Sequence, residues 1–190
     1  MTRDKLLSAA RTLFLAQGYF ATGTEDILRA AGVQRGSLYH HFADKAALLE
    51  SVARQLQGEA MLKIADACAD AGDRLLTGCL AWLDWLSGPG HARLLLRDVP
   101  AYIPERVDEL AQSAFRGWLE NLLLAEIEAG RFDIRARADT ASRMIEGALA
   151  ALAGTEQKAR EELVGDLLGR FSRSGGNDYL KLLAAGRGAR

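Results

Sequence analysis

Two short helices joined by a glycine turn are encoded between Thr22 and Phe42, and this stretch constrains the fold more than any other part of the chain. Thr22 is a favourable N-cap residue, and Glu25, three positions later, completes a capping box. An apolar stripe then leads to Gly32, which can take the left-handed conformation that ends a helix. Helical spacing resumes over residues 34–42. The pattern predicts a helix-turn-helix.

The second helix of this pair has an apolar face and a polar face. Leu38 and Phe42, four residues apart, are expected to enter a core, and His41 beside Phe42 is interpreted as structural. On the polar face, Arg35 can form a bidentate bond to guanine, and His40 can donate to a base edge or a phosphate. The residues predicted to contact DNA are Thr22, Gln34, Arg35, Gly36, Ser37, Tyr39, His40 and Lys45. The alternative for any one of them is a solvated surface residue.

Charge is distributed unevenly along the chain, whose net charge is -1. Residues 1–55 contain seven Lys and Arg against five Asp and Glu, a net of +2, which leaves -3 for the remainder. DNA binding must therefore be local rather than the effect of a general basic field. Lys45 lies in the first turn of a helix, where a cation opposes the helix dipole, so a phosphate partner explains it better than local structure does.

The rest of the sequence predicts further helices and no strand. Apolar residues recur at helical spacing, and the runs are bounded by capping residues, glycine or proline. Gly58 can bend or break the longest of them. With the two helices of the motif, the predicted helices number about nine, and the others span residues 2–17, 44–71, 72–86, 91–98, 104–129, 139–153 and 155–171. The expected fold class is all-α.

Several other classes of site and location are not supported by the sequence. Neither a metal-binding nor a catalytic motif occurs, so no cofactor, metal or enzymatic activity is expected. Cys68 and Cys79 could form a redox switch, but Cys79 lies in an apolar stripe and is interpreted as a small core residue. No apolar run reaches the ~18 residues that span a bilayer, and the charged N-terminal segment differs from a signal peptide. A cytoplasmic protein without a membrane partner is expected.

The motif and its flanks contain a set of residues at a specific spacing. They are Leu13-Phe14, Gly18-Tyr19, Thr22, Asp26-Ile27, Ala31-Gly32-Val33, Gly36-Ser37-Leu38-Tyr39, His41-Phe42, Lys45 and Leu48-Leu49. With this spacing, residues 3–52 resemble the DNA-binding domain of TetR-type (tetracycline-repressor-like) transcriptional regulators. Leu28 replaces the usual alanine, so the two helices are expected to cross slightly farther apart. Gln34 replaces the usual serine, and it caps a helix poorly but can reach a base.

The resemblance implies a helix-turn-helix domain over residues 1–52 and a helical regulatory and dimerisation domain over 53–173. Residues 174–190 are expected to form a partly disordered tail. The last two helices would pair with those of a second copy in a four-helix bundle, and the small residues between 147 and 154 support such close packing. The alternative is packing within one subunit. The predicted dimer interface consists of Ile145, Ala148, Leu149, Ala151, Leu152, Leu163 and Leu167.

Aromatic residues are concentrated between positions 82 and 118, where regulators of this type keep their inducer site. Aromatic walls with nearby arginines can hold an apolar or aromatic ligand that carries a polar group. The alternative is that aromatic residues at helical spacing form a core. The predicted ligand-binding residues are Trp82, Trp85, Arg97, Tyr102, Phe115 and Trp118.

The sequence therefore predicts a ligand-responsive, DNA-binding transcriptional regulator that acts as a repressor. As a homodimer it would bind a palindromic double-stranded DNA operator, with two recognition helices in major grooves about one helical turn (~34–36 Å) or somewhat more apart. An unknown small-molecule effector would release it from the DNA. The alternatives are a DNA-binding regulator without an effector and, less in keeping with the motifs, a helical ligand carrier or enzyme.

Overall fold

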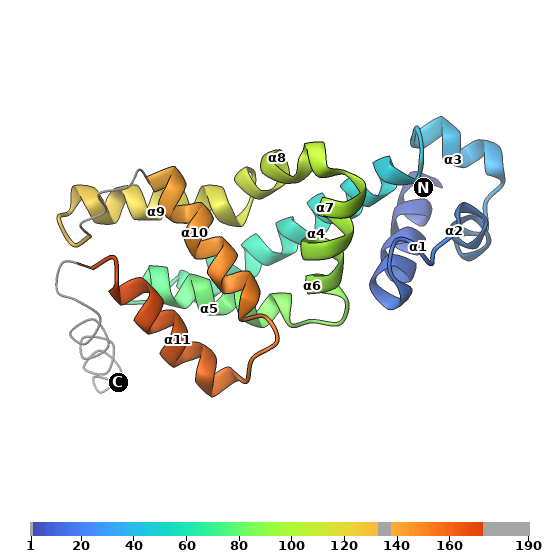
Figure 1. Ribbon diagram of the computed structural model, residues 1–190. Coiled ribbons are helices and arrows are strands. Elements are labelled where there is room, and N and C mark those ends of the chain that lie inside the picture. The colour runs from blue at the N-terminus through green and yellow to red at the C-terminus, as the bar shows by residue number, and fades with distance from the viewer. Residues whose placement is uncertain (1, 133–137, 173–190) are drawn as a thin grey trace. The chain divides into compact units, whose positions relative to one another are not determined.

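The computed structural model describes residues 2–132 and 138–172, and these residues are largely helical (Figure 1). The described residues contain no β-strand, although one isolated bridge joins Phe132 to Ser172. The all-α prediction is confirmed. The elements in chain order are α1 (Thr2–Gln17), α2 (Thr24–Ala31), α3 (Arg35–His41), α4 (Lys45–Cys68), α5 (Arg74–Leu86), α6 (His91–Arg93), the π-helix η1 (Leu94–Asp98), α7 (Val99–Tyr102), the 3-10 helix η2 (Pro104–Arg106), α8 (Val107–Gln112), α9 (Phe115–Glu128), α10 (Ala138–Ala151) and α11 (Gln157–Gly169).

Glycines end the first two helices where the sequence predicts. Gly18 follows α1 with a φ of 89°, and Gly32 follows α2 with a φ of 65°, in the region that residues with a Cβ rarely adopt. The amide of Gly32 donates to the carbonyl of Arg29, and the amide of Val33 donates to that of Leu28. This pair of bonds is the Schellman ending of a helix. The chain therefore turns from α2 into α3 within a few residues.

The start of α2 differs from the prediction by one residue. Gly23 rather than Thr22 is the N-cap, and its amide donates to the carboxylate of Asp26 at 3.1 Å, the role predicted for Glu25. Thr22 is fully buried, and its hydroxyl donates to the carbonyl of Gly18 at 2.7 Å. Because this hydroxyl is committed to the turn after α1, it does not cap α2. The prediction of a capping box between Thr22 and Glu25 is wrong.

The helix α4 begins where the sequence predicts and runs on as one element. Its N-cap is Asp44, whose carboxylate accepts a hydrogen bond from the amide of Ala47 at 2.8 Å. The helix continues through Gly58 and ends at Cys68, three residues before the predicted end. The helix is thus not broken at Gly58, the position where a bend or break was considered.

The helical path from residue 91 is longer than predicted. The sequence predicts a helix over 91–98 followed by a turn around residues 101–103, but α6, η1 and α7 follow one another without interruption up to Tyr102. Pro100 lies in the first turn of α7, directly after the π-helix, where a missing N–H is tolerated. The helical path ends at Ile103, whose φ of -138° and ψ of 54° are not helical.

The single long helix predicted over 104–129 is wrong. The structure divides it into η2, α8 and α9, with a break at residues 113–114. Ala114 has a φ of -133° and a ψ of -123°, which no helix contains. A Cβ at Gly117 would lie 2.1 Å from the carbonyl oxygen of Gln112, so the segments on either side of the break approach too closely for a side chain. This approach is a tertiary contact, which helical periodicity does not reveal.

The described residues fall into two compact units. The first comprises the residues up to Glu59 together with Ser87–Leu110, and the second comprises Ala60–Leu86 together with the described residues from Ala111 onward. Fully buried side chains of the first unit include Leu6, Phe14, Ile27, Leu38, Leu48 and Leu49. Those of the second include Leu83, Leu86, Leu119, Leu123, Ile145 and Leu149.

The domain boundaries over 1–52 and 53–173 remain predictions, and the predicted tail over 174–190 lies outside the described residues. Across residues 2–132 and 138–172, every helix is too short or too polar to cross a membrane.

Candidate DNA-binding interface

The apolar face of α3 is anchored in the first compact unit. Leu38 is fully buried and Phe42 is buried, as the four-residue spacing predicts. Ile27 and Leu28 of α2 are buried as well, and α1 packs against both helices of the motif. The guanidinium of Arg3 lies 5.2 Å from the centre of the Phe42 ring, which covers this residue from the side of α1. The recognition helix is therefore held by one face only.

The other face of α3 is exposed and polar. Arg35 and His40 are exposed, half of the surface of Tyr39 is accessible, and Ser37 is half-buried. Gln34 is the N-cap of α3, but its side chain makes no capping hydrogen bond. A Cβ at Gly36 would meet nothing within 4 Å, so this turn of the helix faces open space. These six residues form the exposed surface that the sequence assigns to DNA contact.

His41 belongs to the same surface, although the sequence suggests a structural role. Its side chain is exposed, and its ring lies 4.9 Å from that of His40 in an edge-on arrangement. Adjacent residues of a helix point about 100° apart, so the burial of Phe42 gives no information about His41. His41 also lies three residues after the buried Leu38, only about 60° away around the helix, so the sequence pattern does not identify it as exposed.

An ion pair links the two helices of the motif at this surface. The Nη1 atom of Arg35, the first residue of α3, donates to the carboxylate of Glu25 on α2 at 3.2 Å. Both side chains remain mostly exposed, at 69% for Arg35 and 63% for Glu25. The neighbouring carboxylate of Asp26 is bound to the amide of Gly23 and to Arg29. Glu25 is thus the acidic residue of α2 that is directed to Arg35.

Two predicted DNA contacts, Thr22 and Lys45, are directed inward instead. The buried side chain of Thr22 has no surface for a phosphate. The Nζ atom of Lys45 donates to the carbonyls of Tyr19 at 3.1 Å and Thr22 at 2.9 Å, and lies 4.0 Å from the centre of the Tyr19 ring. Burial lowers the pKa of Lys45. Local structure therefore accounts for Lys45, and the argument that it needs a phosphate partner is wrong.

A family model described as bacterial regulatory proteins of the tetR family matches residues 6–52, the segment that contains these helices. Residues 6–52 are therefore similar to the DNA-binding part of the tetR family. The match covers the exposed surface of α3 and its anchoring residues, so the resemblance found in the sequence is confirmed.

Individual relatives extend this match to different lengths. The regulator LmrA of Bacillus subtilis is 39% identical over 90 residues, which are 45% of this chain and 46% of LmrA. The chain thus aligns with about half the length of that relative. The repressor Rv1474c of Mycobacterium tuberculosis is 28% identical over 87% of this chain and 90% of its own length. A TetR-family regulator of known structure from Pectobacterium atrosepticum is 28% identical, covers 97% of this chain and 93% of its own, and has a TM-score of 0.68.

The segment around α6 and η1 is docked on the end of α1 in the first unit. The Nη2 atom of Arg93 donates to the carbonyls of Phe14 at 3.0 Å and Leu15 at 2.6 Å in the last turn of α1, and the carbonyl of Phe14 also accepts from the amide of Gly18 at 2.9 Å. The amide of Tyr19 donates to the carboxylate of Asp98 at 2.9 Å. Arg93, the residue before the π-helix, therefore binds the last turn of α1, and Asp98, the last residue of the π-helix, binds the turn that follows it.

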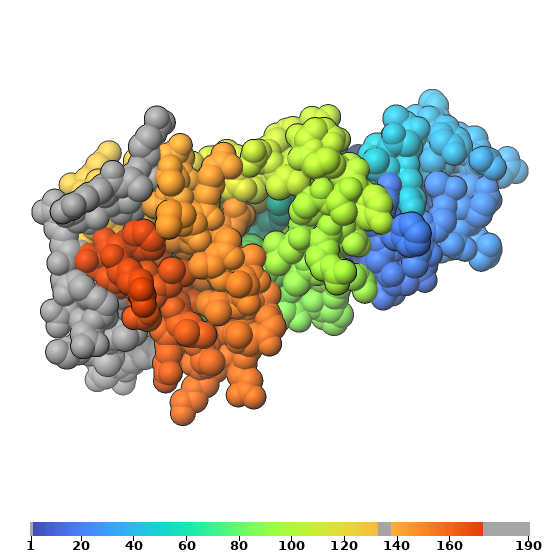
Figure 2. Space-filling model, viewed as in Figure 1, coloured from blue at the N-terminus to red at the C-terminus, as the bar shows by residue number. Residues whose placement is uncertain are grey.

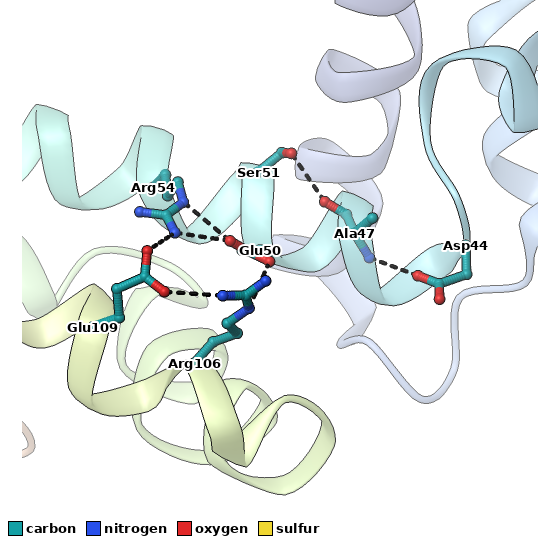
Figure 3. Close-up of polar contacts among 7 residues, drawn as sticks. All are labelled: Asp44, Ala47, Glu50, Ser51, Arg54, Arg106 and Glu109. Carbon is teal, nitrogen blue, oxygen red and sulfur yellow. Dashed lines mark hydrogen bonds and ion pairs between the residues drawn. The ribbon is translucent and has the colours of Figure 1, made fainter.

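A cluster of four charges joins α4 to η2 and α8 in the same unit (Figure 3). Arg54 contacts Glu50 at 2.8 Å and Glu109 at 2.7 Å, and Arg106 contacts Glu109 at 3.0 Å and Glu50 at 3.4 Å. The two arginines raise the charged fraction of Glu109 by lowering its pKa. Because the cluster is partly exposed, salt screens it, and each pair contributes little to stability alone.

The structure brings together three of the six predicted ligand-binding residues. The rings of Trp82 and Phe115 are stacked with centres 4.4 Å apart, and the ring of Trp118 lies 5.6 Å from that of Phe115. Trp82 and Phe115 are buried. A Cβ at Gly78 would lie 2.1 Å from Trp118, so α5 and α9 are in close contact there. Trp82 and Phe115 are therefore core residues of the second unit, and Trp118 is half-buried beside Phe115.

Two of the other predicted ligand-binding residues, Tyr102 and Arg97, belong to the first unit rather than to the second. Tyr102 belongs to the first unit, where its ring lies 4.5 Å from that of Tyr19. Arg97, also in the first unit, is exposed, and Trp85 on α5 is half-buried. Arg116 of α9, which the sequence did not single out, is buried and pairs with Glu146 of α10 at 2.7 Å.

Two of the seven residues of the predicted dimer interface have no accessible surface. Ile145 and Leu149 are fully buried within the chain, so they have no surface left for a partner. Leu163 is exposed, together with Met144, which the sequence did not single out. In the space-filling view the surfaces of α10 and α11 adjoin each other (Figure 2). Accessible surface also remains on the other predicted residues, Ala148, Ala151, Leu152 and Leu167.

Both cysteines are buried free thiols. Burial raises the pKa of Cys79 and of Cys68, with a smaller effect of Asp73 on each. Because the thiolate is the reactive form, these surroundings disfavour the redox switch considered from the sequence. Among the described residues, no group of three His, Cys, Asp or Glu side chains is arranged to hold a metal ion.

Proposed function

We propose that the chain is a DNA-binding transcriptional regulator that acts as a repressor, with α3 as the helix that enters the major groove. The observation that carries this proposal is the exposed polar face of α3 on a helix anchored by Leu38 and Phe42. The tetR family model spans this segment, and the matched relatives include a regulator, LmrA, and a repressor, Rv1474c.

The exposed residues suggest how the helix reads DNA. Arg35 lies at the N-terminus of α3, the end that usually contacts base edges, and its guanidinium suits a guanine. Tyr39, with half of its surface accessible, can donate its hydroxyl to a phosphate. His40 and His41 extend the same surface. Thr22 and Lys45 support the motif from within.

A homodimer that binds a palindromic operator forms the second part of the proposal. One short recognition helix contacts few base pairs, and dimers of such proteins bind two half-sites about one helical turn apart. The accessible apolar residues of α10 and α11, among them Met144 and Leu163, offer a surface for a second copy. A symmetric contact of this kind closes into a dimer.

Release by a small-molecule effector is the third part, and a regulator without an effector is the alternative. An apolar or aromatic effector in the second unit would have to bind one state of the dimer more tightly, typically by ~1–3 kcal/mol. The close stacking of Trp82, Phe115 and Trp118 favours the alternative, because these rings pack against one another rather than around a ligand. A rise in melting temperature with a metabolite or antibiotic library would identify an effector.

The DNA-binding proposal is tested by selecting duplexes from a random library and measuring their affinity by gel shift. Arg35→Ala should weaken binding of the selected duplex by ~5- to 150-fold, the value of a bidentate base contact, and Tyr39→Phe by a smaller factor. Arg131→Ala, which removes an exposed arginine of the second unit, is the matched control and should bind like the parent. Unchanged affinity in both α3 variants would reject α3 as the reading helix.

A further inference from the structure

The carboxylate of Glu25 lies on a surface that the proposed function turns toward DNA, where a negative charge repels phosphates. Its side chain is 63% exposed, so it serves no core. It is also not the capping residue of α2, because Asp26 binds the amide of Gly23. An acidic residue in the first turn of α2 interacts favourably with the helix dipole, which accounts for the presence of Glu25. The dipole does not account for the bond between Glu25 and Arg35 of α3, ten residues farther along the chain.

The bond to Glu25 holds Arg35, the residue proposed to contact a base. Arg35 has a long side chain whose freedom is lost when it binds, and a bond to one terminal nitrogen removes part of this freedom in advance. Glu25 accepts from Nη1 alone. The guanidinium has five N–H donors, so Nη2 and Nε remain to address the O6 and N7 atoms of guanine.

The other cations of the motif are arranged differently. Lys45 donates inward to the carbonyls of Tyr19 and Thr22, and Arg29 pairs with Asp26 on its own helix. Arg35 alone among these three is tied across the two helices of the motif at the exposed surface. The cross-helix tie therefore coincides with the position expected to contact a base.

We infer that Glu25 is a specificity-determining positioning residue, which fixes the guanidinium of Arg35 for one G·C base pair and disfavours its use on the phosphate backbone. This inference rests on the proposed function, because it requires α3 to lie in the major groove. The carboxylate lowers affinity for DNA of any sequence through repulsion, and it raises the discrimination between the correct base pair and the others.

A double-mutant cycle tests this role. The parent, Glu25→Gln, Arg35→Ala and the double variant are each measured with three duplexes of equal length. These are the duplex that the parent selects from a random library, the same duplex with its critical guanine replaced, and an unrelated sequence. The critical guanine is the base whose preference Arg35→Ala abolishes.

Glu25→Gln should bind the unrelated duplex more tightly and discriminate less well against the replaced guanine, by up to about fivefold, the strength of an exposed ion pair. In the Arg35→Ala background the same change should leave discrimination unaltered, because the positioned group is gone. Glu105→Gln removes the same charge from an exposed site in η2, outside the family match, and should retain the discrimination of the parent. Thermal melting of each variant confirms that the glutamine, which has the size of glutamate, leaves the fold intact.

Two results would overturn the inference. The first is a gain in affinity for all three duplexes by one common factor in both backgrounds, which is the effect of charge alone. The second is an unchanged discrimination in Glu25→Gln while Arg35→Ala loses it. A parent protein that selects no preferred duplex would reject the proposed function itself, and the inference with it.

Discussion

A Cβ at Gly90 would lie 2.2 Å from the carbonyl oxygen of Leu15, and Gly90 also has a φ of 79°. Backbone atoms of α1 therefore occupy the place of a side chain, at the point where the segment 87–110 docks on the first helix. Gly130 has a similar φ of 70°, but a Cβ there would meet nothing within 4 Å. A side chain at Gly130 would therefore cause backbone strain alone, whereas a side chain at Gly90 would cause both backbone strain and a steric clash.

Replacement of each glycine by alanine measures these two effects. Gly130→Ala should lower the free energy of unfolding by about 1–2 kcal/mol, the strain of a left-handed alanine. Gly90→Ala should lower the free energy of unfolding by more than this, because the chain must also shift away from Leu15. Urea denaturation of both variants checks the prediction. Equal losses would show that the contact between Gly90 and α1 relaxes freely.

Stability at alkaline pH depends on the buried thiol of Cys79. Burial raises the pKa of this thiol, whereas in the unfolded chain it titrates near ~8.5. Above that pH the folded chain retains a proton that the unfolded chain releases. The free energy of unfolding should therefore fall with rising pH, by at most about 1.4 kcal/mol per pH unit from this group.

Cys79→Ala should have a shallower fall in stability above that pH than the parent, while the two profiles run parallel below it. Urea denaturation at intervals from pH 7 to 10 measures both profiles, and their difference isolates Cys79 from the other titrating groups. Parallel profiles throughout would show that Cys79 ionises in the folded state as well.

At the scale of elements, α4 is a helix with residues in both compact units, because it runs from Lys45 to Cys68 across the boundary at Glu59. Its first half carries the charges of the cluster with Arg106 and Glu109, and Lys45 at its start supports the turn before α2. The helix contains Gly58 near the boundary, and a Cβ there would meet nothing within 4 Å. Neither packing nor backbone conformation requires glycine at this position.

Gly58→Ala should raise the free energy of unfolding by about 0.5–1 kcal/mol, because glycine is a poor residue inside a helix and the site has room for a methyl group. Gln57→Gly, the converse change one residue earlier, should lower it by a similar amount. Urea denaturation tests the pair. A loss of stability in Gly58→Ala would mean that α4 needs flexibility at this point.

At the scale of the whole molecule, assembly decides whether one recognition helix or two can address DNA together. Leu163 on α11 and Leu124 on α9 are exposed to almost the same extent, 45% and 44%. The proposed interface contains the first and not the second. These two leucines therefore provide matched positions for a test of the dimer.

Leu163→Glu should convert a dimer into a monomer at micromolar concentration, because a carboxylate placed in an apolar interface is unpaired. Leu124→Glu makes the same change at equal exposure and should remain dimeric. Size-exclusion chromatography with light scattering measures the mass of each. A monomeric parent, or a dimer that tolerates glutamate at Leu163, would contradict the proposed interface.

Local rules explain which parts of this molecule were predictable. The turn at Gly32, the N-cap at Asp44 and the anchoring of α3 by Leu38 all depend on neighbours within a few residues, and they are confirmed. The assignments that failed depend on distant contacts. Thr22 closes the turn after α1, and Ile145 is covered by its own chain, so neither retains the surface that the sequence assigned to it.

The sequence by itself determined the all-helical fold, the helix-turn-helix and the exposed polar face of its second helix, because periodicity and capping are properties of a few adjacent residues. Only the tertiary structure decided that Lys45 points inward, that His41 points outward and that Arg35 is tied to Glu25. The physical reason is common to all three. A side chain's partners depend on which elements the fold brings beside it, and a pattern along one helix does not contain that information.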